Sequence, residues 1–232
     1  MQGQKIVTGG EGGIAVTKHA DFHYRQLIWG HYNKRCKAEI PANHPLHAFI
    51  LTGAGLKHKA HPLALAVTLH QLRSLDEFHA QKTRYAYQMA RELGHIPFLE
   101  MPSLHRVGAA TCEPAWYAFV MRFKSSKAPN GLTREKFVEE INARGLKDVD
   151  IPRSTGLLHR EPLLNTPEVL FPHLYSKESA NLSRSQGDFE NAQQFYDEAI
   201  ELPVYAMARD QEIVNVCIRV ITFVASKWTR GK

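Results

Sequence analysis

The sequence predicts a mixed α/β fold whose second half is an α+β unit, and three observations support this prediction. A glycine-rich segment near the start lies between two β-branched runs, Ile6–Val7 and Ile14–Thr17. A long stretch from Pro62 to Gly94 has apolar residues at intervals of three and four. Trp116–Phe123 is aromatic and β-branched, as strands are, and an amphipathic helical pattern follows it. Strands and helices combined in this way are typical of layered domains.

The N-terminal segment predicts a β-hairpin. Two β-branched runs that flank Gly9, Gly10, Gly12 and Gly13 have the pattern of strand, tight reversal and strand. Such a hairpin would hold Lys5, which precedes the first strand, in a fixed place. The glycine spacing matches neither a Walker loop nor a dinucleotide fingerprint, so no nucleotide is expected here. From the residues alone, an ordinary glycine hairpin beside a solvated lysine is the favoured interpretation.

The next elements are predicted from periodicity and from residues that end helices. Lys18–Trp29 predicts a short helix that Gly30 ends. Tyr32–Leu56 has no clear period and predicts an extended loop. Pro62 suits a first helical turn, and the pattern up to Gly94 predicts one amphipathic helix of roughly thirty residues. The leucines of this helix are expected in the core.

The second half predicts a strand–helix–strand unit. Trp116–Phe123 is the first strand, and Thr133 caps a helix over Arg134–Arg144. Leu146–Ile151 is expected to be the second strand. Three elements are predicted after it: a helix over Phe189–Ile200, a strand over Leu202–Val204, and a last helix through Ser226.

Composition and charge narrow the classes of function. The chain has 232 residues, 44% of them hydrophobic, which is enough for a substantial core. Its net charge is +6, but Lys and Arg are dispersed, and the densest basic run is His31–Lys37. Nucleic-acid proteins gather such charge into a stripe, so no nucleic acid is expected as a partner. A basic surface also suits an enzyme of anionic substrates.

No membrane span, metal site or disulfide is expected. No stretch of about 18 apolar residues is free of charge, and no secretory leader opens the chain. The three cysteines, Cys36, Cys112 and Cys217, have no metal-binding spacing. They are expected as buried core residues in a protein of the reducing cytoplasm.

One segment resembles a known family. The order Met1-Gln2-x-x-Lys5, followed by Thr8-x-Gly10-Glu11-Gly12-Gly13, resembles the lysine segment of the DegT/StrS family of sugar and cyclitol aminotransferases. These enzymes have fold type I and depend on pyridoxal 5'-phosphate (PLP). The resemblance implies that Lys5 is the catalytic lysine that bonds the cofactor. It also implies that the chain corresponds to the C-terminal half of such an enzyme, or slightly more, without the upstream cofactor-binding portion.

The resemblance carries further expectations about the fold. It implies part of the large domain of the PLP-dependent transferase fold type I, followed by a small α+β C-terminal domain. Residues 1–80 would be the remnant of the PLP-binding domain, with a loop that reaches across a dimer and the start of a linking helix. Residues 81–232 would be the small domain.

Two more site residues follow from the resemblance. In Gly55-Leu56-Lys57-His58-Lys59, Lys57 stands where the family usually has Asn, and it would contact the cofactor phosphate in the other subunit of a homodimer. His159 matches the histidine of the family's Pro-Leu-His stretch, with Leu157 in place of the proline, and would contact substrate.

The implied reaction transfers an amino group from glutamate or glutamine to a keto-sugar or keto-cyclitol. Two alternatives stay open. The chain could be a non-catalytic remnant or one subunit of a split enzyme, since the family's upstream half lies outside it. It could also be a basic binding module, for which the dispersed charge offers less support.

Overall fold

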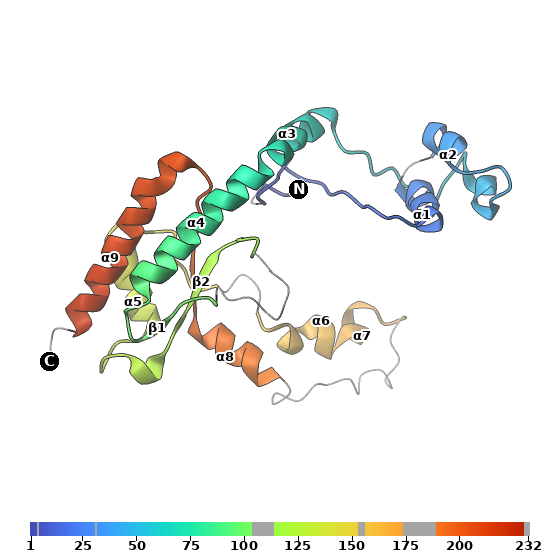
Figure 1. The fold of residues 1–232 in the computed structure, drawn as a ribbon. Helices are drawn as coiled ribbons and strands as arrows, with labels where there is room; N and C mark the ends of the chain where they lie inside the picture. Colours follow the sequence, from blue (N-terminus) through green and yellow to red (C-terminus); the bar gives the residue numbers. More distant parts are fainter. Residues whose placement is uncertain (4, 31, 104–113, 153–155, 174–188, 230–232) are drawn as a thin grey trace, which may run out of the picture. The chain divides into compact units, whose positions relative to one another are not determined.

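The computed structural model describes residues 1–3, 5–30, 32–103, 114–152, 156–173 and 189–229. The chain divides into two compact units, Met1–Asp76 (unit 1) and Glu77–Lys232 (unit 2). Figure 1 shows the mixed helix and sheet content that the sequence predicted. The identity of these units as a cofactor-domain remnant (1–80) and a small domain (81–232) stays a prediction. Across the described ranges, no helix has the length and apolar character needed to cross a bilayer.

Unit 1 has a small core beside its first helices. Helix α1, Ala20–Gly30, confirms the helix predicted over Lys18–Trp29. The extended loop predicted over Tyr32–Leu56 is wrong, because this segment contains helix α2, Lys34–Glu39, and a 3₁₀ helix, Pro45–Phe49. These helices are too short to show a period in the sequence. The buried residues that hold this part together are Leu27, Cys36 and Ile40.

The prediction of an N-terminal hairpin is wrong, because none of the described residues before α1 forms a strand. The backbone groups of this segment bond elsewhere. Gly9 N–H donates to the Met1 carbonyl at 3.0 Å, and Thr8 N–H donates to Oε1 of Gln71 at 2.8 Å. Gln71 belongs to helix α3, Pro62–Arg73. The segment therefore contacts α3. An isolated two-stranded hairpin is at best marginally stable, and these runs have only two to four residues.

We expect Gly9→Ala to destabilise this contact. A Cβ at Gly9 would lie 2.5 Å from Oγ1 of Thr68 and 2.7 Å from the Ala64 carbonyl oxygen, both too close for a methyl group. Such overpacking costs about 1–3 kcal/mol. Gly13→Ala is the matched control, since a Cβ there meets nothing within 4 Å. Limited proteolysis should cleave the segment before α1 faster in Gly9→Ala than in Gly13→Ala, and equal rates would contradict the contact.

The single long helix predicted up to Gly94 is two helices, α3 and α4, Leu75–Leu93. The break is at Ser74, whose N–H donates to the Gln71 and Leu72 carbonyls and closes the end of α3. His61 caps the start of α3, where its Nδ1 accepts the Leu63 N–H at 3.2 Å. Proline in the first turn is confirmed.

The two helices differ in where their apolar residues lie. In α4, Tyr85, Met89 and Leu93 are completely buried, as expected. The leucines of α3 are exposed, contrary to the expected core position. The expectation failed because periodicity shows which residues share a face, and it does not show what covers that face.

Unit 2 is built on a three-stranded antiparallel sheet. Its strands are β1, Leu99–Glu100, β2, Phe119–Phe123, and β3, Ala199–Leu202, in the order β1-β2-β3. Strand β2 confirms the strand predicted over Trp116–Phe123. The register pairs Leu99 with Phe123 and Phe119 with Leu202.

Two predicted strands need correction. Leu146–Ile151 is not a strand, and only Asp150 forms a bridge, to Glu201 of β3. The strand expected over Leu202–Val204 begins earlier, because helix α8, Glu190–Glu198, ends before Ala199. Three of the four residues of β3, Ala199, Ile200 and Leu202, are buried in the core.

Helices α4, α5 and α9 cover the core of unit 2. Helix α5, Arg134–Asn142, confirms the predicted helix, with Thr133 Oγ1 accepting the Lys136 N–H at 3.2 Å. Helix α9, Gln211–Thr229, confirms the last helix. Figure 1 shows α4 and α9 side by side, and Gln211 of α9 donates to Gln88 of α4 at 2.9 Å. Cys36 and Cys217 are buried as expected, and Cys112 lies outside the described residues.

Candidate functional site

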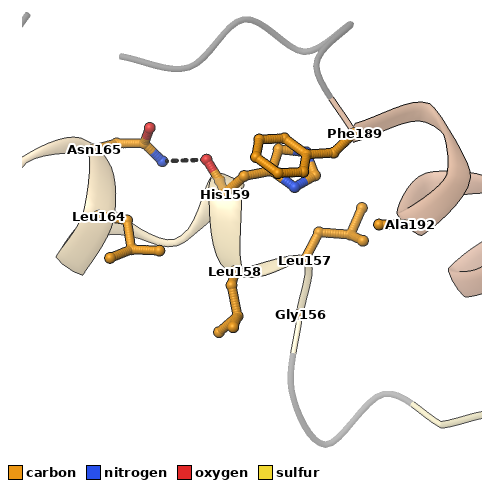
Figure 2. Close-up of a pocket in the computed structure, with 8 residues that line it drawn as sticks. All are labelled: Gly156, Leu157, Leu158, His159, Leu164, Asn165, Phe189 and Ala192. Carbon is orange, nitrogen blue, oxygen red and sulfur yellow. Dashed lines mark hydrogen bonds between the residues drawn. The ribbon is translucent and has the colours of Figure 1, made fainter. Parts of the chain in front are cut away.

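His159, one of the predicted site residues, lines a hollow of about 530 Å³ in unit 2. Three elements form it: the 3₁₀ helix Leu158–Arg160, helix α6, Pro162–Asn165, and the start of α8. Figure 2 shows the ring of Phe189 over the imidazole, whereas the side chains of Leu158 and Leu164 point away from it. The lining residues are Gly156, Leu157, Leu158, His159, Leu164, Asn165, Phe189 and Ala192.

The local sequence explains how this site folds. Pro162 occupies the first turn of α6, where its fixed φ suits a helix and no N–H is needed. The Arg160 N–H donates to the Leu157 carbonyl at 2.8 Å and closes the turn that carries His159. The side chain of Asn165 donates to the His159 carbonyl at 2.9 Å and to the Glu161 carbonyl at 3.0 Å. These bonds fix the backbone of the histidine.

The His159 ring stacks on Phe189, with ring centroids 4.8 Å apart and planes 17° from parallel. Its Nε2 is buried and has no hydrogen-bond partner within the part of the chain that the structure describes. A buried ring nitrogen without a partner is costly. Neutral imidazole can donate or accept there, so this nitrogen is suited to a polar group of a ligand.

The hollow is therefore lined mainly by apolar side chains, together with the imidazole of His159. A ligand with a nonpolar face and a hydroxyl or carbonyl group would satisfy both. Sequence reasoning found His159 but missed Phe189 and Asn165. The prolines that start α6 and the following short helix α7, Pro167–Leu170, were the available signal that the chain turns back on itself here.

Lys5 lies in unit 1 on an exposed bend. Its backbone N–H donates to the Gln2 carbonyl at 3.0 Å. Lys57, also exposed, places its ammonium 5.1 Å from the centre of the Tyr32 ring. A cation over an aromatic face at this distance is weakly attracted.

These two lysines do not form an enclosed cofactor site within unit 1. The hollow described in unit 1 is lined by residues of α1, α2 and the segment before α3, and neither Lys5 nor Lys57 is among them. Because Lys5 is exposed, the described residues do not by themselves form an enclosed site that fits PLP. Among the described residues, no group of three His, Cys, Asp or Glu side chains is placed to bind a metal.

Comparison with known proteins gives consistent matches. Residues 1–221 match the model of the DegT/DnrJ/EryC1/StrS aminotransferase family. The spore coat polysaccharide biosynthesis protein SpsC of Bacillus subtilis is 26% identical over 215 residues, which is 91% of this chain and 49% of that protein. The chain thus spans about half the length of curated relatives such as this one.

The solved structures agree with this on the fold. GDP-4-keto-6-deoxy-D-mannose-3-dehydratase of E. coli, with bound hydrated PLP, has a TM-score of 0.57 and 16% identity over 89% of this chain and 49% of that one. An aminotransferase of Psychrobacter cryohalolentis has a TM-score of 0.59 and 15% identity over 90% of this chain and 49% of that one. At this identity the similarity shows the fold alone.

Proposed function

Because the chain belongs to the DegT/DnrJ/EryC1/StrS aminotransferase family, we propose that it supplies the lysine-bearing half of a PLP-dependent sugar aminotransferase. PLP is the cofactor of this family. The amino donor is glutamate or glutamine, and the acceptor is a keto-sugar or keto-cyclitol in sugar, lipopolysaccharide or secondary-metabolite biosynthesis. The observation that carries the proposal is the family match, which extends over nearly the whole chain.

The proposal assigns roles to three residues. Lys5 bonds the aldehyde of PLP, and Lys57 reaches the cofactor phosphate in the second subunit of a homodimer. His159 contacts the substrate from the apolar hollow of unit 2, and its buried Nε2 supports this role. Unit 1 corresponds to the remnant of the large cofactor-binding domain, and unit 2 to the small C-terminal domain.

The alternative is a non-catalytic remnant or one subunit of a split enzyme. The exposed apolar residues of helix α3 support the idea that further polypeptide packs against this helix. Helices that are apolar on several sides are normally buried. In α3, Leu63 is 71% exposed and Val67 is 50% exposed. The other exposed apolar residues of α3 are Leu65, Leu69 and Leu72. Sequence equivalent to the other half of the relatives would cover this face, whether it precedes the chain or comes from a second chain.

A spectroscopic experiment tests the role of Lys5. We expect this chain alone to give a weak absorbance band with PLP, because Lys5 is exposed. When the chain is joined to the half of B. subtilis SpsC that has no counterpart in it, the band of a lysine-bound cofactor should become strong. Lys5→Ala should abolish this band, and Lys18→Ala, which removes another exposed lysine of unit 1, should leave it.

The outcomes separate the two functions. A strong band that depends on Lys5 supports the aminotransferase. The opposite outcome is a joined protein that unfolds cooperatively and whose Lys5→Ala variant gives the same band as the unmodified protein. That outcome contradicts the role of Lys5 and favours the non-catalytic remnant.

A further inference from the structure

Two restraints of different kinds act on His159. Asn165 donates to its backbone carbonyl at 2.9 Å, and Phe189 stacks on its ring with centroids 4.8 Å apart. The hydrogen bond fixes the backbone from which the side chain starts. The stack fixes how the ring is turned, because two nearly parallel rings in contact limit the rotation of the imidazole. The orientation of the imidazole therefore depends on Phe189.

The stack uses the face of the imidazole and leaves its edge to other partners. An imidazole makes its hydrogen bonds in the plane of the ring, at its two nitrogen atoms. The plane of the Phe189 ring lies 17° from parallel to that plane, so it contacts neither nitrogen as a hydrogen-bond partner. Histidines are commonly oriented by a hydrogen bond to one ring nitrogen, which consumes that nitrogen. Here the buried Nε2 keeps its hydrogen-bonding capacity within the described part of unit 2.

Phe189 stands at the start of a helix whose other end is tied to the sheet. It directly precedes α8, and α8 ends at Glu198, where the chain continues into β3. Oε2 of Glu198 accepts from Nε of Arg122 at 2.7 Å and from Nζ of Lys124 at 2.8 Å. These bonds join the end of α8 to β2 and to the residue that follows β2. Helix α8 is therefore a firm support for the Phe189 ring.

The segment that carries His159 has less support of its own. Helices α6 and α7 have four residues each, and helices this short are not stable in isolation. The contact with α8 is the stack on Phe189, beside which Leu157 and Ala192 both line the hollow. Figure 2 shows the side chain of Leu157 directed towards Ala192. The stack thus places the imidazole relative to the anchored helix.

We propose that Phe189 is the positioning residue of His159, and this inference rests on the proposed function, in which His159 contacts the acceptor. The ring of Phe189 holds the imidazole against α8 before the acceptor binds, with Nε2 kept for a polar group of the acceptor. A side chain that is ordered in advance loses no further freedom on binding. Ordering one side chain during binding weakens affinity by about two- to tenfold.

NMR spectroscopy of the full chain tests the stack. The ring protons of His159 lie over the face of Phe189, so the ring current should shift their resonances upfield. Phe189→Leu keeps an apolar side chain without a ring and should move these resonances downfield, whereas Phe189→Tyr should keep their position. His159→Gln identifies the resonances by their loss. Phe195→Leu, on the same helix and outside the lining of the hollow, should leave them unchanged.

The two half-reactions test the role of the stack in function, with the chain joined to the other half of SpsC. The donor half-reaction, measured with PLP and with glutamate or glutamine, should have the same rate in Phe189→Leu as in the unmodified protein. The acceptor half-reaction is measured with pyridoxamine 5'-phosphate and two probes, scyllo-inosose and GDP-4-keto-6-deoxy-D-mannose. For the probe that reacts, Phe189→Leu should raise KM about two- to tenfold with kcat unchanged, and Phe189→Tyr should restore it.

Three results would overturn the inference. One is the same position of the His159 resonances in Phe189→Leu and in the unmodified chain. Another is an acceptor half-reaction that is absent with both probes or has the same KM in Phe189→Leu. The third is a donor half-reaction slowed as much as the acceptor half-reaction, which indicates a general structural role. Failure of the proposed function differs from these, because the donor half-reaction would then be absent from the unmodified joined protein or would persist in Lys5→Ala.

Discussion

Phe137→Ala should lower the free energy of unfolding by about 3–5 kcal/mol, the largest effect that we expect for a single substitution. Phe137 of α5 is completely buried. Its ring packs edge to face against Phe98, with centroids 5.4 Å apart, and lies 6.0 Å from the ring of Phe123. Truncation would leave a cavity between the helix and the sheet, which surrounding residues cannot fill without moving β2.

Urea denaturation followed by circular dichroism measures this effect. Phe195→Ala is the control, because Phe195 of α8 is 48% exposed and its loss should change stability by less than about 1 kcal/mol. Similar losses for the two variants would contradict the placement of Phe137 in the core.

Arg134→Ala should cost about 2–4 kcal/mol, because it removes a charged donor from one buried and one partly buried carbonyl group. The side chain of Arg134 is 10% exposed. Its Nη1 donates to the Tyr196 carbonyl at 2.7 Å and to the Ala199 carbonyl at 3.3 Å, which ties α5 to the junction of α8 and β3.

Exposed arginines offer a matched control for this prediction. Arg91 of α4 is 76% exposed and pairs only with the neighbouring Glu92 among the described residues. Surface pairs of this kind contribute about 0–1 kcal/mol. If Arg91→Ala and Arg134→Ala shift the urea midpoint equally, the buried donor role of Arg134 is wrong.

The sequence predicted best the elements whose pattern comes from burial within unit 2. Strand β2 alternates buried and half-buried positions, and helices α5 and α9 each bury one face. Thr133 also marks the start of α5. Strand β1 was missed because it has only two residues, too few for any alternation.

Two predictions failed in unit 1 for different physical reasons. The runs beside Gly9 have the composition of strands, but Thr8 and Gly9 bond to Gln71 of α3 and to Met1. The leucines of α3 have the spacing of a core helix, but none of them is buried among the described residues.

For the candidate site, the resemblance supplied Lys5, Lys57 and His159. Of the two hollows described above, one is lined by His159, and neither is lined by Lys5 or Lys57. Phe189 could not be linked to His159 from the sequence, because the two residues meet only through the fold of unit 2.

The most direct test of the central claim is to find where PLP attaches. The protein joined to the other half of SpsC is treated with PLP, reduced with borohydride and mapped by mass spectrometry. We predict that the peptide containing Lys5 carries nearly all of the pyridoxyl label and that the Lys18 peptide carries little. Equal labelling of Lys5, Lys18 and other exposed lysines would contradict the role of this chain as the lysine-bearing half of an aminotransferase.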